Sequence, residues 1–371
     1  GFEVLFDEIP RIVGSIDGAQ RASNETRNRI QCLGEAMAQT GIIGEAEKDK
    51  KLIVGVGSAL VDILAHEEDD FLNRTGAIKG GMTYVSKEFI EKTLSLASNR
   101  SSLVPGGSAC NTIVGIGKLG GAARFIGKCG NGEMGRFFET DLIRQNVEPS
   151  LLRSDSPTGR VLSIITPDAQ RSMFTFLGAS AESSPQDITK DFFSDAAIVH
   201  IEGYLLFNPD LILTVLKMAQ QSGARISLDL ASFNVVEESH DLVEYIVESF
   251  VDILIANEDE AEAYTGHRDE ARAIEALSKK VEIAVLKVGE QGSFIACSGQ
   301  IVPIQPKTGG AVIDTTGAGD LWAAGFLYGL VNGYSLERCG ELGSACGYEV
   351  CQVIGANIPE AGWERIKKLL E

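Results

Sequence analysis

Short apolar runs alternate with helical patterns over residues 52–297, and this alternation constrains the fold more than any other feature of the sequence. The predicted strands lie at 52–57, 122–127, 197–201, 225–230, 252–256, 283–288 and 294–297. Helices are predicted between several of them, at 135–145, 209–221 and 241–249. Strands that alternate with helices are typical of a parallel sheet covered by helices. The sequence therefore predicts an α/β fold with a mostly parallel central sheet.

The net charge and the cysteine pattern limit which binding partners and which cellular location we expect. The chain has 33 Lys and Arg against 52 Asp and Glu, so its net charge is 33 − 52 = −19. Such a balance disfavours nucleic acid and anionic membranes as general partners. The seven cysteines form no CxxC motif, and no signal peptide or membrane-length apolar run is visible. We therefore expect reduced thiols, a cytoplasmic location and a small-molecule partner.

Residues 314–320 combine a tight turn with the start of a helix. The small residues Gly317, Ala318 and Gly319 let the backbone direct its N–H groups one way, and the helix dipole adds positive charge. This arrangement suits a phosphate. Asp320 would repel that phosphate, which suggests that it is a general base acting on an alcohol. The alternative is that Asp320 only caps the helix.

Polar residues also follow the first predicted strand. Asp62 is the one charge in an apolar stretch beyond residue 57, where ligands bind in open α/β sheets. It is either hydrogen-bonded by protein or used on substrate hydroxyls. Further on, the turn at 105–112 has adjacent glycines that permit close backbone approach, and Asn111 adds a donor and an acceptor. This turn suits a polyhydroxylated ligand, although it could equally be a plain helix start.

The ends of two later strands carry further candidates. Asn257 and Glu260 lie three apart, on one face of a predicted helix. Oxygen ligands of this kind suit Mg²⁺, directly or through water, whereas the alternative is an acidic first helical turn. Lys287 and the glycine turn at 289–292 could border a nucleotide.

Two familiar nucleotide-binding motifs are excluded. Residues 115–120 match GxGxxG by letter, but they lie inside the helix opened at Ser108, so they predict a packing face. No Gly-Lys pair is followed by Ser or Thr, so a Walker-type P-loop is absent from the sequence. The four histidines are isolated and suggest no metal site or nucleophilic triad.

Three motifs in the same order resemble the ribokinase-like (PfkB) family of carbohydrate kinases, and within it the adenosine-kinase-like branch. They are the turn at 106–111, the run at 257–260 and the segment 314–320. The resemblance covers about residues 52–360. It implies a three-layer ribokinase-like domain over 51–371, with a small β lid drawn from about 71–85 and 158–178. Residues 1–50 are then an N-terminal extension and linker of unknown role.

The resemblance also implies roles for individual residues. Asp320 would be the base, and the backbone of Gly317, Ala318 and Gly319 the anion hole. The residues implied to bind substrate are Ser58, Asp62, Gly106, Gly107 and Asn111. Those implied for ATP are Lys287, Gly289, Gly292 and Thr316. Asn257 and Glu260 would organise Mg²⁺, and Asp314 with Thr316 could hold K⁺, as in some members.

The expected function is ATP-dependent phosphorylation of a primary hydroxyl of a nucleoside or sugar, with adenosine as the favoured acceptor. The segments 166–173, 177–179 and 201–204 resemble bacterial adenosine kinases. One departure is Ser58, because adenosine kinases usually have Asn at this place. Alternatives are a free-sugar kinase for ribose or fructose, and a nucleoside-binding protein without turnover. A β lid can pair between subunits, so the chain is expected to be a monomer or a homodimer.

Overall fold

The computed structural model describes residues 50–370, except 78, 80, 98–100 and 169–170. The predicted extension at 1–50 therefore lies almost wholly outside the described residues.

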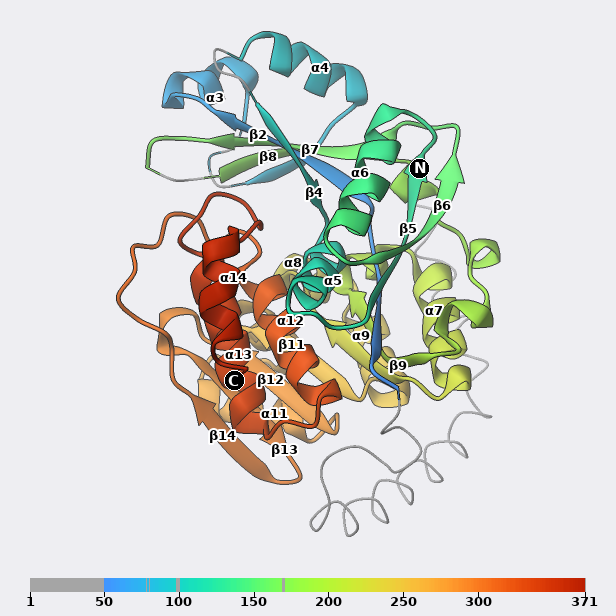
Figure 1. Cartoon of the computed structure of the whole chain (residues 1–371), viewed down its shortest axis with the longest axis vertical. Helices are drawn as coiled ribbons and strands as arrows, with labels where there is room; N and C mark the ends of the chain where they lie inside the picture. The colour runs from blue at the N-terminus through green and yellow to red at the C-terminus, as the bar shows by residue number, and fades with distance from the viewer. Residues whose placement is uncertain (1–49, 78, 80, 98–100, 169–170, 371) are drawn as a thin grey trace. The chain divides into compact units, whose positions relative to one another are not determined.

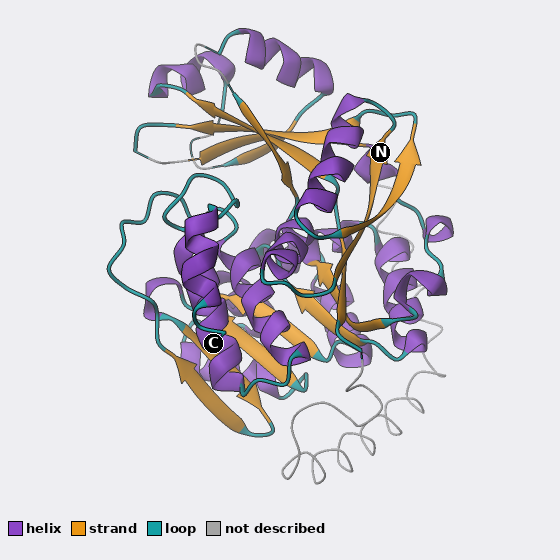
Figure 2. Cartoon of the chain, in the orientation of Figure 1, coloured by secondary structure: helices purple, strands orange, loops and turns teal. Residues whose placement is uncertain are grey.

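A nine-stranded sheet forms the centre of the described chain (Figures 1 and 2), with strand order β14-β13-β12-β11-β10-β9-β1-β5-β6. Its strands are β1 (Leu52–Val56), β5 (Ala123–Gly130), β6 (Glu148–Ser154), β9 (Ala196–Glu202), β10 (Arg225–Asp229), β11 (Ile253–Asn257), β12 (Ile283–Lys287), β13 (Ser293–Cys297) and β14 (Gln300–Ile304). Pairing is parallel from β6 to β12, while β13 and β14 are antiparallel. The predicted mostly parallel sheet is confirmed.

Helices cover both faces of this sheet, which gives three layers. The helices are α5 (Ser108–Lys118), α6 (Glu133–Arg144), α7 (Pro209–Ser222), α8 (Phe233–Glu238), α9 (His240–Phe250), α10 (Glu258–Thr265), α11 (Glu270–Ser278), α12 (Ala318–Val331), α13 (Leu336–Val350) and α14 (Glu360–Lys367). One apolar core joins α7 to α11 with strands β9 to β12. Another joins α12, α13 and α14. Short 3-10 turns are η2 (Ala179–Glu182), η3 (Pro185–Asp187), η4 (Lys190–Phe193), η5 (Gly203–Phe207) and η6 (Gly289–Gln291).

A second, five-stranded sheet has the order β3-β8-β7-β2-β4. Its strands are β2 (Leu60–His66), β3 (Met82–Tyr84), β4 (Ser102–Gly106), β7 (Thr158–Ile165) and β8 (Arg171–Gly178), and the helices α3 (Asp69–Thr75) and α4 (Lys87–Ser95) accompany it. The sheet draws on more of the chain than expected, because β2 and β4 belong to it. Among the described residues of the stretch 71–85, only Met82–Tyr84 is strand. Asp69 and Asp70 in the first turn and Gly76 at the left-handed end instead favour the helix α3.

The two faces of this small sheet have different surroundings. Ile63 and Ala65 pack in a cluster with Phe71 of α3 and Ile90 of α4. Asp62 lies between Val61 and Ile63 on β2 and lines a cavity on the opposite side. Because successive side chains of a strand point to opposite faces, the same strand serves both the core and the cavity.

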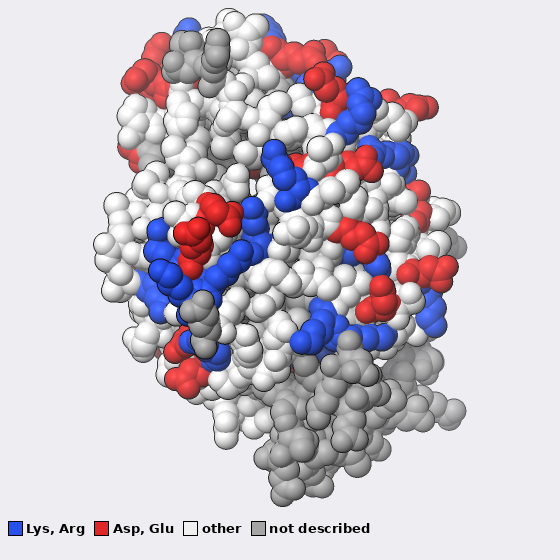
Figure 3. All heavy atoms as spheres, in the orientation of Figure 1, with Lys and Arg blue, Asp and Glu red and all other residues white. Residues whose placement is uncertain are grey.

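Acidic and basic side chains are interspersed over the face shown in Figure 3. Across the described residues, every helix is too short or too polar to cross a bilayer.

Candidate active site

A cavity of about 1120 Å³ collects most of the residues predicted from the sequence. Its lining includes Ser58, Asp62, Gly107, Asn111, Asn257, Glu260, Lys287, Gly289, Gly292, Thr316, Gly317, Ala318, Gly319 and Asp320. Gly106 and Asp314 are not in this lining, but Gly106 precedes the lining residue Gly107, and Asp314 accepts a hydrogen bond from the lining residue Thr316. The cavity is bounded by the carboxyl ends of several parallel strands, where open α/β sheets bind their ligands.

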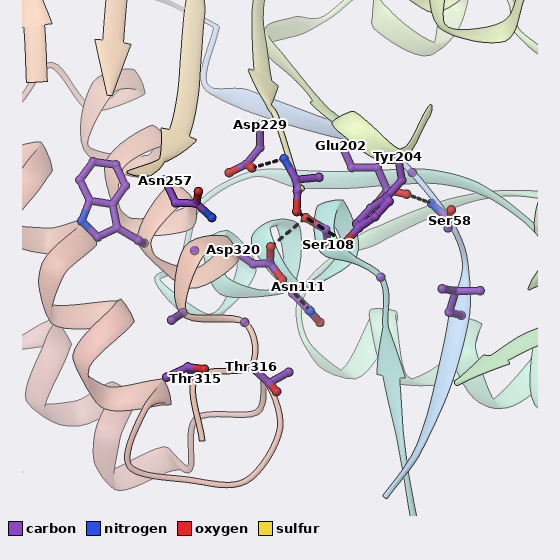
Figure 4. A pocket seen from close by; sticks show the side chains of 18 of the residues that line it. Ser58, Ser108, Asn111, Glu202, Tyr204, Asp229, Asn257, Thr315, Thr316 and Asp320 are labelled. Atoms are coloured by element: carbon purple, nitrogen blue, oxygen red, sulfur yellow. Dashed lines mark hydrogen bonds between the residues drawn. The ribbon is translucent and has the colours of Figure 1, made fainter. Parts of the chain in front are cut away.

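Asp320 lies in the first turn of α12 and faces α5 (Figure 4). Its two carboxylate oxygens accept hydrogen bonds from Ser108 Oγ at 2.8 Å and from Asn111 Nδ2 at 2.9 Å. Burial raises the pKa of the Asp320 carboxyl to about 6, although these two bonds oppose the shift. Residues of another helix, α5, therefore orient the carboxylate, as expected for a general base. The alternative, that Asp320 caps its own helix α12, has no support in these hydrogen bonds. Asn111, predicted to bind substrate, contacts this carboxylate.

The turn before α12 has the backbone that the sequence predicts. Gly317 has φ 73°, a left-handed conformation that favours glycine, and a Cβ there would lie 2.6 Å from Ala356 Cβ. Gly317, Ala318 and Gly319 line the cavity at this helix start, where helix N–H groups favour an anion, although the Ala318 N–H already donates to the Thr315 carbonyl at 3.1 Å.

Lys287 places a positive charge at this helix start. Its Nζ lies 2.9 Å from the position that a Cβ on Gly319 would occupy. The same Nζ donates to Asp229 Oδ2 at 2.9 Å, and both side chains are largely buried. Lys287 is therefore fixed beside the glycine turn as a potential phosphate ligand. Sequence reasoning missed Asp229, although it is the lone carboxylate of the strand predicted at 225–230.

Asn257 and Glu260 form a reciprocal cap at the start of α10. Asn257 Oδ1 accepts from the Glu260 N–H, and the Glu260 carboxylate accepts from the Asn257 N–H and Nδ2, all at 2.8–2.9 Å. Burial, and then the negative charge of Asp229, raise the pKa of Glu260 above its usual value. The pair thus has the capping role that was the alternative to metal binding, while its oxygens keep further lone pairs.

Asp314 supports the glycine turn from behind. One of its oxygens accepts from the backbone N–H and Oγ1 of Thr316, at 2.9 and 2.7 Å, and the other accepts from the Gly355 N–H at 2.8 Å. Both predicted K⁺ ligands therefore already have protein partners, and their role toward a cation stays a prediction.

Residues 57–58 and 106–107 form a narrow backbone wall that we call the glycine cradle. A Cβ on Gly106 would lie 2.6 Å from Asp62 Oδ1, and one on Gly107 would lie 2.2 Å from the Ser58 carbonyl oxygen. Glu202, at the end of β9, accepts from the Ser58 N–H at 2.8 Å. Its role was not predicted, because its partners are far away in the sequence.

Substituting Gly107 by Ala tests the cradle. The backbone φ of 105° and the 2.2 Å approach to Ser58 leave no room for a methyl group. We expect G107A to lose about 1–3 kcal/mol from backbone strain alone, and more from the clash. Chemical denaturation measures this loss; Gly132→Ala is the control, since a Cβ there meets nothing within 4 Å. Equal stability of the two variants would contradict the geometry.

Residues 80–361 match the pfkB family of carbohydrate kinases. The chain belongs to this family. It is therefore a sugar or nucleoside kinase, a phosphotransferase for which the family implies ATP as the co-substrate.

The PfkB relatives carry names of different acceptors. The chain is 29% identical over 256 residues to 5-dehydro-2-deoxygluconokinase of Listeria monocytogenes, covering 65% of this chain and 78% of that protein. The crystal structure of adenosine kinase from Sinorhizobium meliloti has a TM-score of 0.79 and 33% identity, covering 87% of this chain and all of that one. A probable sugar kinase from Rhizobium etli also has a TM-score of 0.79, with 32% identity over 86% of this chain and 98% of that one. The predicted ribokinase-like fold is confirmed.

Such kinases typically use Mg²⁺, and the side chains of the cavity show whether they could bind it. The described residues contain no group of three or more His, Cys, Asp or Glu arranged to hold a metal ion. Mg²⁺ keeps several waters and binds phosphate oxygens, so one or two carboxylates suffice. Asp229 and Asp320 both raise the pKa of Glu260 by repulsion, so a dication near these carboxylates would relieve that repulsion. The donor set fits a water-mediated site.

Proposed function

We propose that this PfkB kinase transfers the γ-phosphoryl group of ATP to the primary hydroxyl of a nucleoside, with adenosine as the acceptor. The observation that carries the proposal is the lining of the cavity on the side of the glycine cradle and the small sheet. The apolar and aromatic side chains there include Leu60, Met82, Tyr84, Ile126, Leu152, Val161, Met173, Leu177, Ile188, Tyr204, Leu205, Phe207 and Leu211. Such a wall favours a planar, uncharged base over a small polyol.

The distribution of positive charge supports an uncharged acceptor. Among the described residues that line the cavity, the basic ones are Lys287 and Lys307. Lys287 lies against the turn before α12, and Lys307 belongs to the segment that leads to that turn. A gluconate, the acceptor named for the Listeria relative, carries a carboxylate that would need its own cation on the opposite side. The likeness to adenosine kinase of S. meliloti also supports a nucleoside.

The chemistry follows from the positions of the side chains. Asp320 takes the proton of the primary hydroxyl, and the hydroxyl oxygen attacks the γ-phosphorus as ADP leaves. The N–H groups of Gly317 and Gly319 and the Lys287 ammonium hold the phosphoryl oxygens as charge builds up. Asp62 and the glycine cradle hold the sugar hydroxyls. Asn257 and Glu260 would hold a bound Mg²⁺, which would supply neutralising charge on the phosphates.

The test is ADP release with adenosine, inosine, ribose, fructose and 5-dehydro-2-deoxygluconate as acceptors. A base the size of an aromatic side chain buries about 150 Å², which at about 25 cal/mol/Å² contributes up to about 4 kcal/mol. We therefore expect kcat/KM for adenosine to exceed that for ribose by up to about a thousandfold.

Other outcomes would redirect the proposal. A preference for ribose or fructose would overturn the nucleoside acceptor and retain the kinase. A rise in melting temperature with adenosine but no ADP release would point to a binding protein without turnover.

Activity should also depend on pH through Asp320. Its pKa is raised from 3.8 to about 6, and the base must be deprotonated to act. The kcat/KM for the acceptor should therefore fall by at least about tenfold per pH unit below about pH 6. A profile that stays flat down to pH 4.5 would contradict the assignment of the base.

A further inference from the structure

We infer that Glu202 is a positioning residue, which fixes the glycine cradle and the start of α5 relative to Asp320. Glu202 is 1% exposed and lies at the carboxyl end of β9. The inference rests on the proposed function in one respect, namely that the acceptor binds at the glycine cradle.

The start of α5 lacks a cap from its own sequence. Its N-cap residue is Gly107, which has no side chain, and its first turn contains no acidic residue. A helix N-terminus leaves N–H groups unpaired and favours a negative charge. Glu202, on the strand β9, supplies an acceptor and a negative charge at this helix start. Its Oε2 accepts a hydrogen bond from the Ala109 N–H at 3.0 Å.

The same carboxylate holds the other half of the cradle. Glu202 Oε1 accepts from the Ser58 N–H at 2.8 Å (Figure 4). A Cβ on Gly57 would lie 2.3 Å from Glu202 Oε2, so the residue before Ser58 leaves space for the carboxylate by having no side chain. One buried group thus joins the segment that follows β1 to the segment that begins α5.

The link continues to the catalytic base. Ser108 and Asn111, in the first turn of α5, donate to the two carboxylate oxygens of Asp320. A shift of the α5 start would therefore move the acceptor cradle and the donors that orient the base together. Burial raises the pKa of Glu202 to about 7, while the bonds from Ala109 and Ser58 oppose this shift. Keeping such a group buried is costly, which is consistent with a specific task.

The test compares Glu202→Gln and Glu202→Ala in the full chain. Gln keeps one acceptor oxygen but turns an NH₂ group toward the second backbone N–H, and Ala removes both acceptors. We expect the acceptor KM to rise about tenfold or more in E202A and by a smaller factor in E202Q, with the ATP KM changed less than about twofold. Glu349→Gln is the matched control, because Glu349 is also a buried carboxylate but is bonded to Arg365.

A substrate-free measurement accompanies the kinetics. Deuterium uptake of residues 107–112 should increase in E202A and stay at the wild-type level in E349Q. Unchanged uptake, or an acceptor KM within twofold of wild type in E202A, would overturn the inference. Equal rises in both KM values would also overturn it, because they would indicate a general structural role.

The acceptor used is whichever member of the panel the wild type phosphorylates fastest. A preference for ribose would then remove the nucleoside proposal without touching this test. If the wild type phosphorylated none of them, the proposed function would fail and deuterium uptake alone would decide the role of Glu202.

Discussion

Replacing Asp320 by Asn should lower kcat by about 10²–10⁴-fold, the share that a positioned general base contributes. Asn has nearly the same shape as Asp, so its packing against Ser108 and Asn111 should be retained. One acceptor oxygen becomes an NH₂ donor. Because burial disfavours the charged form of Asp320, the neutral variant should unfold at the same or a higher temperature. Steady-state ADP release and thermal unfolding separate loss of chemistry from loss of fold.

A matched control for this variant is Asp141→Asn. Asp141 is a buried carboxylate of α6 that bonds to Gln145 and does not line the cavity. Its substitution should leave kcat within about twofold. If D320N and D141N had similar kcat values, Asp320 would not be the base.

Replacing Lys287 by Met should lower kcat by about 10²–10³-fold, the usual effect of removing one donor to the developing negative charge. It should also destabilise the protein by about 3–5 kcal/mol, because Asp229 would remain as an unpaired buried charge. kcat and the denaturation midpoint are both measured on the purified variant.

The double variant K287M/D229N separates these two effects. It removes both charges, so stability should recover toward the wild-type value. Catalysis should stay low, because the phosphoryl group still lacks its cation. If activity recovered together with stability, Lys287 would serve only the fold.

The parts of the site that were predictable depend on short-range patterns. The turn before α12 and Asp320 lie within a few residues, and their backbone chemistry can be argued from glycine and a helix start alone. The mostly parallel sheet was predictable for a related reason, because the pattern of apolar residues along the sequence differs between buried strands and helices.

The parts that were missed depend on partners far apart in the chain. Glu202 and Asp229 each end a strand as lone carboxylates, the same reason that singled out Asp62. What distinguishes them is a contact with Ser58 or Lys287, which no local pattern contains. The helix α3 was missed because its signals occupy only seven residues and a true strand, β3, follows within the same stretch.

Which strand belongs to which sheet could also not be predicted from the sequence. Only residues 57–59 separate β1 from β2, yet β1 lies in the large sheet and β2 in the small one. Neighbouring strands usually pair with one another, so adjacency in the sequence gave no sign of this separation.

The contacts that organise the site join residues far apart in the sequence, which affects when the enzyme gains catalytic activity during its synthesis. Ser108 and Asp320 are 212 positions apart, and Ser58 and Glu202 are 144 apart. A chain emerging from the ribosome at about 5–20 residues per second completes α5 well before α12 exists. Until α12 docks, Ser108 and Asn111 have no carboxylate to orient, so a nascent or prematurely terminated chain could assemble much of its sheet and still lack phosphoryl-transfer activity.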